Sequence, residues 1–92
     1  MISLEDVVGF CDLTVDEVHA IAEHEHLDAI LAAGLGACLL QAEQGPAQIR
    51  DMIVDDLRAA VRRRDVASAR QLVCTLRQFL HEHPEAEFRR AA

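Results

Sequence analysis

The sequence predicts an all-α fold, a compact bundle of four to five helices in a single domain over residues 1–92, with a frayed tail at 85–92. Three observations support this prediction. Apolar residues make up 51% of the chain and are mostly aliphatic, which suits the core of one domain. Apolar positions recur at helical spacing behind capping residues, and no segment shows the alternation typical of a strand.

The first two helix starts are marked by capping residues. Ser3 precedes two acidic residues, and a hydroxyl followed by acids is typical of a first helical turn. Thr14 and Glu17 have the spacing of a capping box, and Leu13 can pack back as a hydrophobic staple. We therefore expect a short helix from Ser3 and a second helix from Thr14.

The apolar stretch "AILAAGLGACLL" occupies residues 29–40 and is too short to span a bilayer. Alanines recur at every fourth position from Ala29 to Ala37, with Gly34 and Gly36 beside them. Glycine in a helix interior costs about 1 kcal/mol relative to alanine, so we expect a neighbouring backbone to approach closely there. This segment is predicted to be the central and most buried helix, with close packing at Gly34 within the protomer or across a dimer.

The second half of the chain predicts two longer helices. Gly45 suits a left-handed helix end, and Pro46 suits the first turn of the helix that follows. Three arginines at 62–64 stand at the C-terminal end of that helix, where its dipole favours cations. Asp65 is expected to cap the last long helix, and Pro84 to end it.

The predicted core combines apolar residues from three of these helices. Eight of them are expected to be buried together: Leu31, Leu35, Leu39, Ile53, Leu57, Leu72, Val73 and Leu76.

The charges are divided unevenly along the chain. Residues 1–45 hold nine acidic residues and no Lys or Arg, whereas residues 46–92 hold all nine arginines and seven acids. We expect the two halves to pack against each other or against a second copy. The net charge of −7 repels a phosphate backbone, so no nucleic-acid partner is expected.

The cysteines and the N-terminus favour a cytoplasmic setting. Cys11, Cys38 and Cys74 are odd in number and widely spaced, as in a reducing compartment, and the latter two are expected in the core. The first ten residues lack the basic flank and long apolar run of a signal peptide, and no membrane partner is expected.

The stretch "AIAEHEH" at 20–26 is the candidate for chemistry. On a continuous helix His19, Glu23 and His26 share one side, and two imidazoles with a carboxylate are a ligand set for iron or zinc. Glu23 and His26 also have the Glu-x-x-His spacing that di-iron bundles take from each of two helices. A second copy of this motif would have to come from the partner chain in a dimer. The alternatives are that the helix breaks before Leu27 and the segment is a solvated helix end, or that the segment forms a pH-sensitive contact.

A second acid–imidazole cluster, "HEHPE", follows the last long helix. His81 and His83 are expected to be ordinary residues of a helix C-terminus, unless they approach Glu23 and complete a coordination shell. No arrangement of nucleophile and base stands out, so no catalytic residue is predicted and the chain is not expected to be an enzyme.

The segments "FCDLTVDEVHAIAEHEH", "RDMIVDDLRAA" and "TLRQFLHEHPE" together resemble a small uncharacterised family of all-helical bacterial proteins with an LT-x2-E…IAEHEH segment. The resemblance covers most of the chain. It implies a compact helical fold and a bacterial cytoplasmic setting, and it adds no catalytic residue.

Two functional hypotheses follow. The first is a non-enzymatic helical interaction module without a cofactor, which self-associates as a dimer or binds another protein. The second is an iron- or zinc-binding helical bundle that uses Glu23 and His26, with His19, within one chain or across a dimer.

Overall fold

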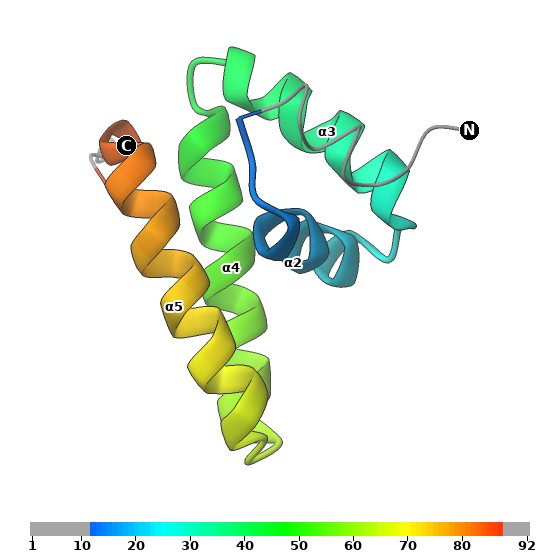
Figure 1. The fold of residues 1–92 in the computed structure, drawn as a ribbon, viewed down its shortest axis with the longest axis vertical. Helices are drawn as coiled ribbons and strands as arrows, with labels where there is room; N and C mark the ends of the chain where they lie inside the picture. The colour runs from blue at the N-terminus through cyan, green and yellow to red at the C-terminus, as the bar shows by residue number, and fades with distance from the viewer. Residues whose placement is uncertain (1–11, 88–92) are drawn as a thin grey trace.

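The computed structural model describes residues 12–87 and contains four α-helices and one 3-10 helix (Figure 1). In chain order the elements are α2 (Val15–Glu25), α3 (Ala29–Gln41), α4 (Gly45–Arg62), α5 (Val66–Glu82) and η1 (Pro84–Glu87). Residues 12–87 contain no strand. The predicted all-α bundle of four to five helices is confirmed, whereas the helix expected from Ser3 lies outside the described residues.

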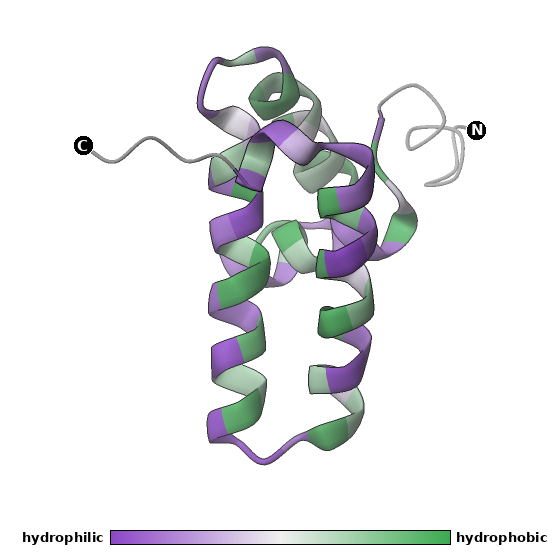
Figure 2. Ribbon diagram, turned by 90° about the vertical axis from the view of Figure 1, so that its left-hand side faces the viewer, coloured by the Kyte–Doolittle hydropathy of each residue, from purple (hydrophilic) through white to green (hydrophobic). Residues whose placement is uncertain are grey.

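Helix α4 is the centre of the arrangement, because it packs against α2, α3, α5 and η1. Helices α4 and α5 run antiparallel and side by side, while α3 packs beside the upper part of α4 and α2 lies beside its middle (Figure 1). The lower end of this α4–α5 hairpin extends beyond the other helices in both views (Figures 1 and 2). The described part of the chain measures 38 × 31 × 21 Å.

Side-chain caps fix the helix starts where the sequence predicts them. The Thr14 hydroxyl accepts a hydrogen bond from the Glu17 backbone N–H at 3.1 Å, and the Thr14 N–H donates to Glu17 Oε1 at 2.9 Å. Asp65 accepts from the Ser68 N–H at 3.1 Å and so caps α5. These bonds satisfy N–H groups that a helix start leaves without an intrahelical partner.

The core combines aliphatic residues of α2, α3 and α4 with Leu13, Phe79 of α5 and Ala86 of η1. Of the eight predicted core residues, Ile53 is fully buried, and five others are partly buried: Leu35, Leu39, Leu57, Leu72 and Leu76. The prediction is wrong for Leu31 and Val73, whose exposed fractions are 59% and 39%. Both lie on helix faces that no other described element covers.

Helix α3 is not the most buried helix, contrary to the prediction. It packs only against α2 and α4 within residues 12–87, and its fully buried residues are Ala32, Ala33 and Gly36. The close approach occurs at Gly36, where a Cβ would meet the side chains of Leu13 and Ile21, whereas the space at Gly34 is open. An apolar run without periodicity does not tell which of its faces will be covered.

Gly45 has a different role from the one predicted. No glycine in residues 12–87 has a positive φ, and Gly45 is the first residue of α4. A Cβ at this position would overlap the backbone carbonyl of Leu39, so glycine is required by a close approach between α3 and α4. The left-handed positions are instead His26 (φ 57°) and Arg64 (φ 60°).

Two further expectations differ from the structure. Cys38 and Cys74 are free and exposed, not buried in the core. Part of the expected frayed tail, residues 85–87, belongs to η1, whose Ala86 is fully buried in the core, and residues 88–92 lie outside the described range. Among the described helices, none is long and apolar enough to cross a membrane.

Candidate functional site

The segment "EHEH" lies where α2 ends. The helix stops at Glu25, and His26 adopts the left-handed conformation and donates its N–H to the Ala22 carbonyl. Asp28 then begins α3 by accepting a hydrogen bond from the Leu31 N–H at 2.9 Å. The break expected before Leu27 is therefore present, and the single continuous helix needed to align His19 with His26 is not.

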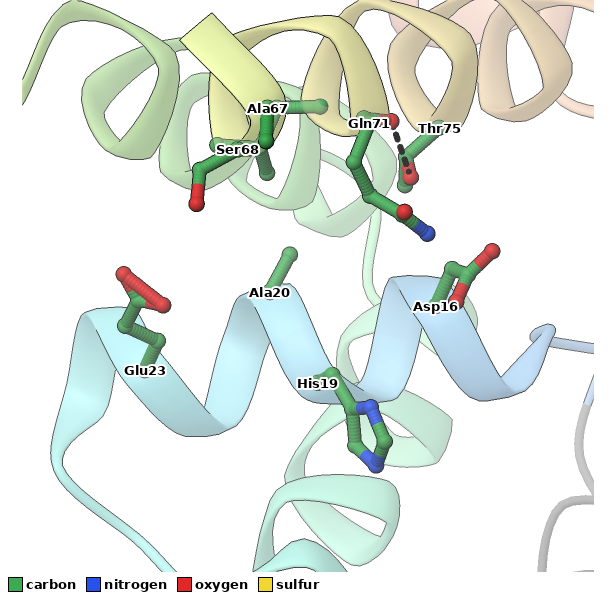
Figure 3. Close-up of a pocket in the computed structure, with 9 residues that line it drawn as sticks. Asp16, His19, Ala20, Glu23, Ala67, Ser68, Gln71 and Thr75 are labelled. Carbon is green, nitrogen blue, oxygen red and sulfur yellow. Dashed lines mark hydrogen bonds between the residues drawn. The ribbon is translucent and has the colours of Figure 1, made fainter. Parts of the chain in front are cut away.

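The structure separates the three candidate metal ligands. His19 and Glu23 line a polar hollow of about 420 Å³ between α2 and α5, whereas His26 lies beyond the helix end and does not line it. Figure 3 shows Glu23 directed toward α5 near Ser68 and the His19 ring directed away from α5. Within residues 12–87, no three His, Cys, Asp or Glu side chains form a group that could hold a metal ion.

The hollow has carboxylates on one side and neutral polar groups on the other (Figure 3). Asp16 and Glu23 come from α2, and Ser68, Gln71 and Thr75 come from α5. The Thr75 hydroxyl donates to the Gln71 carbonyl at 2.9 Å, and this bond occupies the one hydroxyl proton. The residues that line the hollow therefore contain no hydrogen-bonded pair of nucleophile and base.

His24 is the member of the segment that connects two helices. Its Nδ1 lies 2.7 Å from Glu25 Oε2 and its Nε2 lies 3.0 Å from Asp55 Oδ2 on α4. Partial burial lowers the pKa of His24, but the hydrogen bonds to these carboxylates raise it, and the result lies above its ordinary value. The imidazole thus links the end of α2 to the middle of α4.

Asp56 is a buried carboxyl beside this link, and the sequence analysis missed it. Its exposed fraction is 7%, and within the described structure its Oδ2 has no hydrogen-bond partner. Burial, with a smaller contribution from the negative charge of Glu23, raises the pKa of Asp56 to about 6. The position could have been found, because Asp56 falls between Ile53 and Ala60 on the buried stripe of α4.

The second histidine cluster lies at the other end of α2. His83 Nε2 is 3.1 Å from the Asp12 carbonyl, and its ring packs against Phe79 with centroids 4.7 Å apart. Burial raises the pKa of Glu17 above its ordinary value, and the backbone hydrogen bond at Thr14 and the proximity of His83 oppose that rise. His83 therefore lies beside Glu17 of the capping box, which is two turns of α2 before Glu23.

An apolar groove runs along the free end of the α4–α5 hairpin. It encloses about 820 Å³ between the end of α4 and the start of α5. Three valines that line it have unusually high exposed fractions: 59% for Val61, 62% for Val66 and 39% for Val73. Figure 2 shows apolar segments recurring on both helices down to the turn. We refer to this surface as the hairpin groove.

The groove residues follow the spacing of helices that pack against further helices. On α4 they include Leu57 and Val61, and on α5 Val66, Ala69 and Val73, so the steps are of three and four residues. This is the spacing of the apolar seam in coiled coils and helix bundles. Within residues 12–87, no residue of α2 or α3 lines the groove, so no third helix covers that seam.

Comparison with known proteins adds no relative. No family model, no curated protein sequence and no solved structure matches this chain, so the resemblance to a bacterial family stays a prediction.

Proposed function

We propose that this protein is a non-enzymatic helical interaction module that self-associates, and that the hairpin groove is the surface through which it does so. The observation that carries the proposal is the open apolar groove with Val61, Val66 and Val73 exposed along it. Large contiguous apolar surfaces are uncommon on monomers and are typical of interaction sites.

Energetics support this reading of the groove. Each square ångström of apolar surface removed from water contributes about 25 cal/mol, so covering the three valines and their neighbours favours association. The 3-and-4 spacing on both helices suits a further helix laid along the hairpin. The polar hollow on the neighbouring face of α5 offers no comparable apolar area.

The test is a single charge placed in the groove. Val73→Asp buries a carboxylate wherever the groove is covered, and we expect it to weaken self-association at least tenfold while leaving the fold intact. Sedimentation velocity over a range of protein concentrations measures this. Gln78→Asp is the matched control, since it adds the same charge at an exposed position of α5 outside the groove. Wild-type protein that stays monomeric at every concentration would contradict the proposal.

A further inference from the structure

The large exposed aliphatic side chains of the described residues fall into two patches, and the hairpin groove is one of them. The other lies at the start of α3, where Ile30 and Leu31 are 53% and 59% exposed. We call these two residues the α3 knob. They lie in the first turn of α3, and together with Asp28 and Ala29 they line a shallow hollow.

The two patches have opposite charges around them. The α3 knob lies beside the exposed Asp28, in a half of the sequence that contains no Lys or Arg. The hairpin groove is lined by Arg64 and Arg70. Asp65 also lines it and lies 3.7 Å from Arg63 Nη2, so the groove lining carries two positive charges and one negative charge.

In the described structure, no arginine forms an ion pair with an acidic residue of the first half. Arg50 pairs with Asp51 at 2.8 Å, and Arg63 pairs with Asp65 at 3.7 Å, so both pairs join near neighbours in the second half. Opposite charges on two surfaces of one molecule attract when two copies meet. Two grooves facing each other would instead bring Arg64 and Arg70 against their own equivalents, and like charges disfavour that pairing.

We infer that the occupant of the hairpin groove is the α3 knob of a second copy of this chain. Ile30 and Leu31 then cover the exposed valines, and Asp28 meets the arginines of the groove. The inference rests on the proposed self-association and specifies which surfaces touch. If each copy both gives its knob and receives one, the assembly closes as a two-fold dimer, and otherwise the same contact propagates as a chain.

A mixing experiment tests this pairing. Leu31→Lys disables the knob and leaves the groove intact, whereas Val73→Asp disables the groove and leaves the knob intact. Each variant alone is expected to associate at least tenfold more weakly than wild type in sedimentation velocity. A 1:1 mixture is expected to form a mixed dimer, because the intact knob of one variant fits the intact groove of the other. The mixed species is detected by energy transfer between differently labelled chains.

Controls separate loss of contact from loss of fold. Gln41→Lys adds the same charge at an exposed position of α3 away from the knob, and it should associate as wild type does. Thermal melts by circular dichroism check that each variant is folded. Ile30→Lys provides a second knob variant should Leu31→Lys melt early.

The outcomes distinguish the inference from the proposed function. If the knob variant associates like wild type and the groove variant does not, the groove binds another surface, and only the inference is overturned. The same holds if both variants are monomeric and their mixture gives no mixed dimer. If both variants associate like wild type, the groove is not the contact and both the inference and the proposed surface are wrong.

Discussion

At the scale of single residues, Asp56 is the least expected feature of the chain. It lies on the α4 face that buries Ile53 and Ala60, so its carboxyl is removed from water together with them. Charge on a buried carboxylate is costly, and the nearby charge of Glu23 adds to the cost. The pKa of Asp56 therefore rises from 3.8 to about 6, and the folded state holds a proton that the unfolded state releases.

This proton links stability to pH. Because the folded-state pKa is above the unfolded value, Asp56 makes the protein less stable as pH rises from about 4 through 6. We expect Asp56→Asn to be more stable than wild type by about 1–3 kcal/mol at pH 7–8 and to lose most of the pH dependence in this range. Urea melts at several pH values measure both effects. Glu43→Gln, at an exposed site, should behave like wild type. A less stable Asp56→Asn at pH 8 would contradict the argument.

In the same urea melts, the stability of Asp56→Asn should still show a smaller pH dependence, which comes from His24. Its pKa is raised by the carboxylates of Glu25 and Asp55 against the opposing effect of burial, so its stabilising charge is present below pH 6.5. That contribution is lost as pH rises through the higher folded-state value.

At the scale of helices, boundaries were easier to predict than burial. The starts of α2 and α5 followed from Thr14 and Asp65, since a cap is a local hydrogen bond that neighbouring residues determine. The environment of α3 could not be predicted in the same way. Its sequence is apolar on every face, so only the tertiary contacts of α2 and α4 decide that Ala33 is buried and Leu31 is not.

Gly45 is in close contact with backbone and Gly34 faces open space, so the two glycines give a paired prediction. Gly45→Ala places a methyl group against the Leu39 carbonyl, which is backbone and cannot turn aside, so we expect a loss of about 1–3 kcal/mol. Gly34→Ala meets nothing within 4 Å and adds a better helix former, so we expect a gain of about 0.5–1 kcal/mol. Chemical denaturation of both variants tests the pair. Equal effects of the two substitutions would show that the α3–α4 contact is placed incorrectly.

The candidate site was less predictable than the fold. The sequence placed His19 and Glu23 on one side of α2, and both do line one hollow. It could not show that His26 would leave the helix by adopting a left-handed backbone, nor that Asp55 of α4 would reach His24 across 31 residues. The contacts that matter here join separate helices, and periodicity within one helix carries no information about them.

At the scale of the whole molecule, charge and apolar surface are arranged together. The acidic half contributes the α3 knob, and the arginine-rich half contributes the hairpin groove. The uneven charge of the sequence predicted that the two halves would pack against each other or against a second copy. Within residues 12–87, His24 and Asp55 form an ion pair that joins the two halves, and Arg64 and Arg70 line the groove.

Salt should therefore weaken the proposed association. The Debye length falls from about 30 Å at 0.01 M ionic strength to about 3 Å at 1 M, which screens attraction between exposed charges. We expect the dissociation constant of wild type to rise at least severalfold as sodium chloride is increased from about 0.02 to 0.5 M, measured by sedimentation equilibrium. Arg70→Gln should weaken association at low salt and reduce the salt dependence, because it removes one charge from the groove and leaves the valines in place.

Arg58→Gln is the control, because Arg58 is at an exposed position of α4 that does not line the groove. This substitution should change neither the association at low salt nor its salt dependence. An association that is unchanged or strengthened by salt would indicate a purely apolar contact, and the pairing of opposite charges would then have no part in holding the copies together.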